Sequence, residues 1–223
     1  MMERTAILIP AFNAADTLPD LLQRLQKYVH AEDVIVVDDG STDNTANVAR
    51  GYKVRVLQHD RNYGKGRALR TGFDHVTRSS NYDAVVTMDA DLQHRPEELP
   101  LFISLRESQG FDLIIGCRER WGTAMPLHRK LSNTITSSLV AARTGIAVKD
   151  SQCGYRLIAR SVLQSVRTGS DGYEAETELL IKAARQGFRL AFVPIKTVYA
   201  NEKSSMTNFR TTLRFLNVLL KEY

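Results

Sequence analysis

The chain has 223 residues, of which 43% are hydrophobic and 25% charged, as in an ordinary globular protein with a substantial core. A net charge of +5 and a pI near 9.3 favour acidic partners, but the basic residues are scattered, so charge alone does not single out nucleic acid. No stretch approaches the roughly 18 apolar residues of a membrane span, so any contact with a bilayer is expected to be peripheral. Two distant cysteines, Cys117 and Cys153, predict reduced thiols in a cytoplasmic protein.

The first half of the chain alternates short apolar runs with segments of helical period. Strands are expected at residues 5–10, 33–39, 53–58, 83–89 and 112–118, and helices at 14–29, 41–50, 64–76 and 95–110. The run "DVIVVDD" is rich in β-branched residues, which is typical of a strand buried on both faces. Ser41, Thr42 or Asp43 is expected to cap the short helix that follows this run. The repeats predict right-handed crossovers and a mainly parallel sheet flanked by helices.

The second half of the chain is less regular. Helices are expected at 127–143, 174–187 and 207–223, a loop with a short strand and helix at 150–166, and a strand at 188–200. An apolar stripe on the last helix consists of Phe209, Leu213, Leu216 and Leu220. Packing of this stripe against the sheet or a second subunit is the favoured interpretation, and contact with a membrane surface is the alternative. Because no linker or repeat interrupts the pattern, a single α/β domain over residues 1–223 is expected.

Polar and acidic residues follow the expected strands, at the edge where open parallel sheets bind their ligands. Many of these residues have a simpler interpretation as caps and turns. Asp89 and Asp91 are harder to explain in that way, because two like charges separated only by Ala90 follow a buried strand. With Gln93 they form an oxygen-rich set that suits Mg²⁺ or Mn²⁺, which often also binds substrate phosphates. His94 is a less favoured third ligand.

Five motifs, in chain order, resemble those of family 2 glycosyltransferases: "ILIPAFNAADTL", "VIVVDDGSTDNT", "RNYGKGRALRTGF", "MDADLQHRPEEL" and "DSQCGYRLI". The similarity is greatest to the dolichyl- or polyprenyl-phosphate mannosyltransferase-like branch and covers most of residues 5–206. This resemblance implies the GT-A fold, a Rossmann-like fold of nucleotide-diphospho-sugar transferases. It also implies a nucleotide-sugar-binding half over 1–118 and an acceptor-binding half over 119–223.

The resemblance assigns donor-site roles to residues in the first half. It implies that Pro10 and Phe12 line the nucleotide base, that Asp39 reads uracil or guanine, and that the Gly64–Gly66 loop approaches the nucleotide. The donor-binding residues it implies are Pro10, Phe12, Asp39, Gly64, Lys65, Asp89, Ala90 and Lys203. The metal-binding residues it implies are Asp89, Asp91 and Gln93. The sequence departs from many relatives at Ala14, where they carry an acid.

The resemblance also assigns roles on the acceptor side. Arg118 and Arg129 resemble arginines that hold an acceptor phosphate, through the parallel hydrogen bonds that a guanidinium makes. Solvated surface arginines are the alternative for both. Asp150 matches a loop near the acceptor, and Lys203 in "VYANEKSSM" resembles a diphosphate contact. The expected catalytic residues are therefore Asp91, Asp150, Arg118 and Arg129.

The function that the resemblance implies is an inverting, metal-dependent transfer of a sugar from a UDP- or GDP-sugar to an acceptor. A polyprenyl phosphate is the favoured acceptor, since its oxygen is already ionised at neutral pH. Transfer to a sugar hydroxyl of a glycan or glycolipid is the alternative and would need a base, for which Asp150 is the candidate. A non-catalytic nucleotide-sugar-binding protein, a nucleotidyltransferase and a nucleic-acid-binding domain are less favoured. The enzyme is expected in the cytoplasm, with peripheral contact to the membrane as an option and no nucleic acid partner.

Overall fold

The computed structural model describes the backbone of residues 3–79, 81–118, 127–196 and 209–223, and the side chains of all of these except 127–129 and 209–212. Its sheet consists of β1 (Thr5–Ala11), β2 (Val34–Asp38), β3 (Arg55–Gln58), β4 (Ala84–Thr87), β5 (Leu113–Arg118), β6 (Arg156–Ala159) and β7 (Leu190–Ile195). The helices are α1 (Leu18–Leu25), α2 (Thr45–Gly51), α3 (Lys65–Arg78), α4 (Leu99–Gln109), α5 (Leu127–Thr144), α6 (Arg160–Ser165), α7 (Glu174–Arg185) and α8 (Phe209–Leu220). Two short 3₁₀ helices cover Ala31–Asp33 and Pro96–Glu98.

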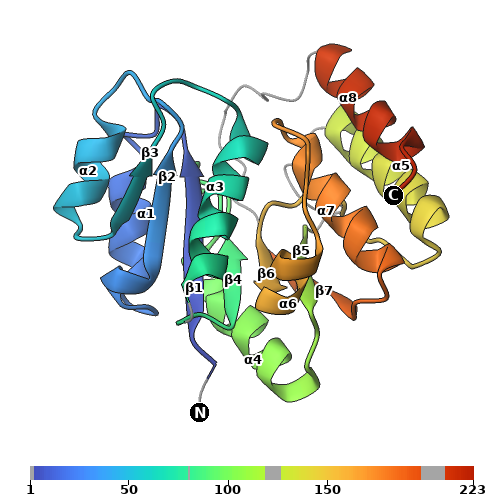
Figure 1. The fold of residues 1–223 in the computed structure, drawn as a ribbon, viewed down its shortest axis with the longest axis horizontal. Coiled ribbons are helices and arrows are strands. Elements are labelled where there is room, and N and C mark those ends of the chain that lie inside the picture. The colour runs from blue at the N-terminus through green and yellow to red at the C-terminus, as the bar shows by residue number, and fades with distance from the viewer. Residues whose placement is uncertain (1–2, 80, 119–126, 197–208) are drawn as a thin grey trace.

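The strands form one sheet in the order β3-β2-β1-β4-β6-β5-β7 (Figure 1). All pairs are parallel except the two that involve β6, which runs antiparallel between β4 and β5. The prediction of a mainly parallel sheet flanked by helices is therefore confirmed. The sequence did not predict that the short strand expected near residue 156 would separate β4 from β5.

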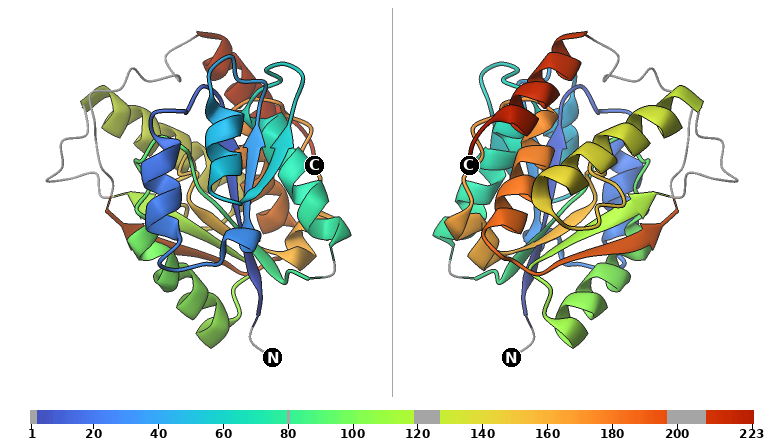
Figure 2. Two further views of the ribbon diagram at one scale, coloured as in Figure 1. Left: turned by 90° about the vertical axis from the view of Figure 1, so that its left-hand side faces the viewer. Right: turned by 90° about the vertical axis from the view of Figure 1, so that its right-hand side faces the viewer.

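The core follows the hydrophobic pattern. All five residues of β2 are buried, as the continuous β-branched run predicts for a strand covered on both faces. On α1 the leucines Leu18, Leu21, Leu22 and Leu25 are buried on one side of the helix. Helix α3 packs against β1 and β2, and α1 lies across the sheet from it (Figure 2). Because β2, β1 and β4 are adjacent and parallel, their carboxyl ends lie at the same edge of the sheet.

The start of α2 differs from the predicted bound because a side chain hydrogen-bonds to the backbone there. The helix expected from residue 41 begins only at Thr45, and Asn44 precedes it without a side-chain capping bond. Ser41, Thr42 and Asp43 therefore do not cap this helix. The carboxylate of Asp43 instead accepts hydrogen bonds from the amide and hydroxyl of Thr45. A side chain that closes such a turn competes with the helix for the same backbone groups.

The described part of the apolar stripe on the last helix does not pack against the sheet, so for these residues that half of the favoured interpretation is wrong; the side chain of Phe209 lies outside the described part. Leu213, Leu216 and Leu220 are exposed, whereas Val218 and Leu219 on the other side of α8 are buried. Helix α8 contacts α7 and α5, and lies beside α5 in both figures (Figures 1 and 2). Among the described helices, none combines the length and hydrophobicity needed to cross a bilayer.

Candidate active site

The carboxyl ends of β1, β2 and β4 open into one cleft of about 550 Å³. The predicted donor-site residues that line it are Pro10, Phe12, Asp39, Gly64, Lys65, Asp89, Ala90 and Asp91. They come from four segments spread over about eighty residues of sequence, and the parallel strand order brings them to the same edge. Phe12 lines the cleft and is half exposed although it is a large aromatic residue, so it offers apolar surface on which a planar group can stack.

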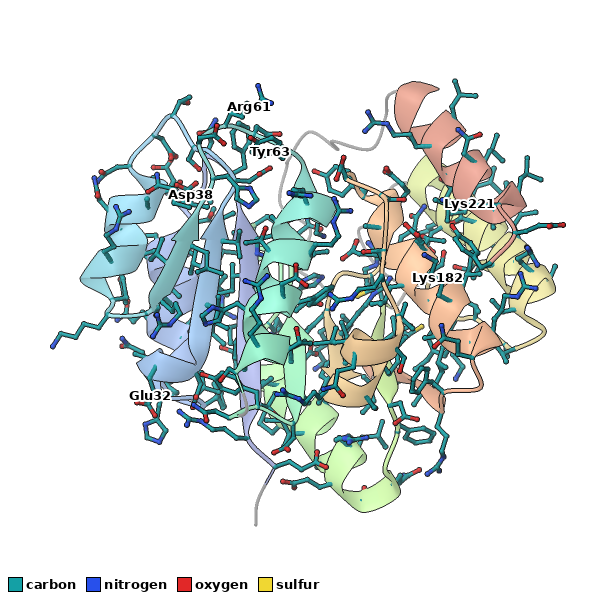
Figure 3. The ribbon with its side chains drawn as sticks, in the orientation of Figure 1. Glu32, Asp38, Arg61, Tyr63, Lys182 and Lys221 are labelled. Atoms are coloured by element: carbon teal, nitrogen blue, oxygen red, sulfur yellow. The ribbon has the colours of Figure 1, made fainter. Side chains whose placement is uncertain are left out.

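Asp39, at the end of β2, is buried and holds the loop that precedes α3. Its carboxylate accepts hydrogen bonds from the backbone amides of Tyr63 at 3.0 Å and Gly64 at 2.7 Å. The Nδ1 atom of His59 lies 2.6 Å from the same carboxylate, and its Nε2 lies 2.9 Å from the hydroxyl of Thr71. Figure 3 shows Tyr63 at this end of the molecule, close to Arg61, whose guanidinium lies over its ring. Asp39 therefore shapes the cleft as well as lining it.

Gly64 is required at the turn into α3. Its φ of 103° lies in the region that residues with a side chain rarely adopt. A Cβ atom there would lie 2.4 Å from the carbonyl oxygen of Asp171, in the loop before α7. The amide of Gly66 donates a hydrogen bond of 2.7 Å to that same oxygen. The two glycines thus let the start of α3 lie directly against a loop that is more than a hundred residues later in the sequence.

The first acid of the D-x-D motif is paired with a lysine. Lys65 Nζ lies 2.5 Å from Asp89 Oδ1 and 3.1 Å from Glu176 Oε1 of α7. Burial would lower the pKa of Lys65, but the charges of the two carboxylates outweigh it and hold that pKa above its ordinary value. In the same way, burial would raise the pKa of Asp89, and the Lys65 charge more than reverses it. The ammonium group of Lys65 therefore lies between the carboxyl groups of Asp89 and Glu176, and Lys65 and Asp89 both line the cleft.

The turn that carries the motif is fixed by hydrogen bonds from backbone amides to side chains. The amide of Gln93 donates to Asp91 Oδ1 at 3.0 Å, and Leu92 has a positive φ of 63°. The amide of Asp89 donates to Nδ1 of His94 at 3.2 Å, and burial lowers the pKa of this histidine to about 4. The lone pair on Nδ1 is thus engaged by the backbone, which argues against His94 as a third metal ligand. Gln93 is not among the described residues that line the cleft.

Arg118 and Asp150 form an ion pair at the end of β5. Arg118 donates through Nε at 2.8 Å and Nη2 at 3.0 Å to the two oxygens of Asp150, which is fully buried. Asn133 of α5 and the amide of Gln152 donate to the same carboxylate at 3.2 and 3.1 Å. Burial would raise the pKa of Asp150, and the Arg118 charge lowers it further than burial raises it. A buried carboxylate with this many donors is a poor general base.

Two predicted residues cannot be placed. Lys203 lies outside the described residues, and Arg129 belongs to α5 but its side chain is outside the described part. Other residues were missed by the sequence analysis: Gly172, Tyr173 and Glu174 before and at the start of α7 and Arg214 of α8 line the cleft, and Glu176 pairs with Lys65. Three glutamates at alternate positions of one helix, Glu174, Glu176 and Glu178, are all buried. Buried acids need partners, so the burial of these glutamates in the structure is the observation that points to them.

The metal chemistry of the cleft depends on what two carboxylates can hold. Among the described residues, no group of three or more His, Cys, Asp or Glu side chains is arranged to bind a metal ion. Asp89 and Asp91 supply oxygen ligands at the cleft, the kind that Mg²⁺ and Mn²⁺ prefer. Magnesium usually takes one or two carboxylates and completes its shell with water and substrate phosphates. The donor set therefore fits a cation that arrives with a diphosphate.

Comparisons with known proteins agree with this geometry. Residues 6–167 match the family described as Glycosyl transferase family 2. An uncharacterized protein of Methanocaldococcus jannaschii is 30% identical, over 95% of this chain and 94% of its own. The undecaprenyl-phosphate 4-deoxy-4-formamido-L-arabinose transferase of Klebsiella pneumoniae is 27% identical, over 98% of this chain and 66% of its own.

Solved structures show the same fold. The glucosyl-3-phosphoglycerate synthase of Mycobacterium tuberculosis, crystallised with Mn²⁺, UDP and phosphoglyceric acid, superposes with a TM-score of 0.80 at 22% identity. The match covers 98% of this chain and 78% of that one. The same protein was also crystallised with Mg²⁺ and UDP, and that structure has a TM-score of 0.79. With most of its length matched by the family and its fold that of the GT-A enzymes, the chain belongs to glycosyl transferase family 2 and is a glycosyltransferase.

Proposed function

We propose that this glycosyltransferase moves a sugar, with inversion and with the help of a divalent metal, from a nucleoside-diphosphate sugar to a polyprenyl phosphate. The observation that carries the proposal is the cleft in which Asp89 and Asp91 lie beside Lys65 and the Asp39 turn. Two comparisons support it. The structural neighbour was crystallised with UDP and Mn²⁺, and the Klebsiella pneumoniae relative is named for an undecaprenyl-phosphate acceptor.

The donor is proposed to lie along the cleft with its base toward Phe12 and Asp39. The half-exposed ring of Phe12 provides a stacking surface, and Asp39 Oδ2, which accepts the amide of Gly64, has a second lone pair that can accept the imino hydrogen of uracil or guanine. Lys65 lies between this end and the D-x-D turn, where its ammonium can donate to the diphosphate. A Mg²⁺ or Mn²⁺ ion held by Asp89 and Asp91 would supply further positive charge as negative charge grows on the departing nucleotide.

The acceptor is proposed to be a phosphate because Asp150, the candidate general base among the described residues, is poorly suited to that role. Asp150 is fully buried and already accepts hydrogen bonds from Arg118, Asn133 and Gln152. A phosphate oxygen is ionised at neutral pH and attacks the anomeric carbon without losing a proton. Asp150 then acts as a positioning residue, which fixes the orientation of the Arg118 guanidinium near the end of β5. Arg118 would in turn attract the acceptor phosphate.

The test has a donor part and an acceptor part. A thermal-shift panel of UDP-, GDP- and dTDP-sugars with Mn²⁺ identifies the donor, since ligand binding to the native state raises the melting temperature. Transfer from that donor is then measured with a polyprenyl phosphate and with a neutral glycan. Transfer to the lipid phosphate that disappears in Asp91→Ala supports the proposal. Transfer only to the glycan, with severe loss in Asp150→Asn, would establish the hydroxyl acceptor instead.

A further inference from the structure

His59, the residue that follows β3, is engaged at both ring nitrogens. Its Nδ1 lies 2.6 Å from Asp39 Oδ1, and its Nε2 lies 2.9 Å from the hydroxyl of Thr71 on α3. An ionised carboxylate only accepts hydrogen bonds, so Nδ1 carries the hydrogen that lies between the two side chains. The side chains of His59 and Asp39 are only 12% and 4% exposed, so this bond is largely shielded from water.

The donors that surround the Asp39 carboxylate leave it little capacity to accept more. A carboxylate offers about four lone pairs, two on each oxygen. Oδ1 accepts from His59 and from the amide of Tyr63, and Oδ2 accepts from the amide of Gly64. Counted over the described residues, these three bonds leave a single lone pair, on Oδ2. Because Asp39 lines the cleft, that lone pair is the one that a bound base can use.

Nucleobases differ in the number of N–H donors that they bring to such a carboxylate. Uracil and thymine bring one, the imino hydrogen on N3, which lies between two carbonyl groups. Guanine brings two neighbouring donors, the imino hydrogen on N1 and the amino group on C2, and these need two acceptors side by side. Cytosine has a lone pair on N3 in place of the imino hydrogen. A site with one free acceptor therefore satisfies uracil or thymine and leaves a donor of guanine unpaired.

We propose that His59 determines the base specificity of the cleft, by limiting Asp39 to one hydrogen bond from the base and so selecting a uracil or thymine nucleotide over a guanine nucleotide. This inference rests on the proposed function, because it takes Asp39 as the residue that reads the base. His59 is not among the described residues that line the cleft, so it acts through the lone pair that it occupies on Oδ1. The bond between Nε2 and Thr71 holds the imidazole ring in the orientation that this requires.

The test measures the affinity of the whole chain for UDP, GDP and CDP by titration calorimetry, with Mn²⁺ present in each titration. The three nucleotides share the ribose and the diphosphate, so a difference in affinity between them reports the base. UDP is expected to bind at least about tenfold more tightly than GDP or CDP, because each of the other bases leaves a polar group without a partner. GDP or CDP binding as tightly as UDP overturns the proposal.

Two variants at residue 59 separate the hydrogen bond from general effects. His59→Ala removes the Nδ1 hydrogen and frees a lone pair on Asp39 Oδ1, so the ratio of UDP affinity to GDP affinity should fall by roughly threefold or more. His59→Asn is the matched control, because its side-chain amide can donate from the position of Nδ1, and it should keep the wild-type ratio.

A role of His59 in folding alone would weaken the binding of all three nucleotides alike, so an unchanged ratio in His59→Ala overturns the proposal. If the alanine variant does not fold, the order of affinities in the wild type still decides. Binding of none of the three nucleotides would overturn the proposed function as well. A preference for GDP would overturn only the role of His59 and leave the proposed reaction standing.

Discussion

Replacing Lys65 with methionine removes the ammonium group that occupies the first carboxylate of the D-x-D motif. Lys65 Nζ lies 2.5 Å from Asp89 Oδ1, so any divalent cation bound to that carboxylate must share it with a positive charge. Methionine has a similar length and no charge. We expect Lys65→Met to bind Mn²⁺ more tightly than the wild type in the absence of nucleotide, and to be less stable without the metal.

The size of both effects follows from the distances. A divalent ion roughly 5 Å from an ammonium is repelled by about 1.7 kcal/mol at the dielectric constant of water and by about 7 kcal/mol at an effective value of 20. Even the smaller figure corresponds to more than about tenfold in affinity. Without Lys65, Asp89 and Glu176 face each other without a counter-charge, and breaking such a pair costs about 3 kcal/mol. For a chain of this size that lowers the melting temperature by roughly 6–12 °C.

Titration calorimetry with MnCl₂ at about pH 8 measures the affinity, at a pH where both carboxylates stay ionised. Thermal unfolding with and without Mn²⁺ measures how far the metal restores the melting temperature of Lys65→Met. Lys182→Met is the matched control, because Lys182 pairs with the buried Glu178 at 2.7 Å and is not among the cleft residues. It should lose stability and gain no affinity. Equal or weaker Mn²⁺ binding by Lys65→Met would refute the idea that lysine and metal compete for Asp89.

Three further predictions concern the fold around the cleft. Asp150→Asn should lower the free energy of unfolding at neutral pH by about 3 kcal/mol, measured by urea unfolding. Because the pKa of Asp150 is lower in the folded state than in the unfolded state, its carboxylate contributes fully above the unfolded pKa of about 4, and the contribution is lost as the pH falls through the folded pKa. The stabilities of the wild type and the variant should therefore converge in acid. Gly64→Ala, whose Cβ meets the oxygen of Asp171, should cost clearly more stability than Gly145→Ala, which has a positive φ and nothing within 4 Å. The thiol of Cys153, whose pKa burial raises to about 12, should resist iodoacetamide at pH 8 until the chain is unfolded.

Local patterns predicted the elements of the fold, and they could not predict how the strands pair. The continuous apolar run of β2 and the leucine face of α1 follow directly from burial and period. The position of β6 does not, because its four residues are buried whichever strands flank them. The exposure of Leu216 was also unpredictable, since a helical stripe has the same period whether it meets the core or the solvent.

In the candidate site, too, local motifs predicted some residues and tertiary packing decided the others. Asp39 and Asp89 belong to short motifs at strand ends and Gly64 to the turn into α3, and all three line one cleft. Glu176 comes from a helix more than a hundred residues beyond Lys65, and no nearby residue indicates that the two will meet. Motif spacing therefore identified the residues that line the cleft early in the chain. The partners that set their charge come from tertiary packing.

The position of β6 affects how the protein can be made. Among the described strands, β5 pairs with β6 and β7, both of which are translated after it, and one edge of β4 pairs with β6. While the ribosome has delivered only β1 to β5, three strand edges that the complete sheet pairs are still open, one on β4 and two on β5, and such edges favour aggregation. Slow synthesis between residues 118 and 156 would prolong this exposure. A nascent chain paused there is where a chaperone would be most needed.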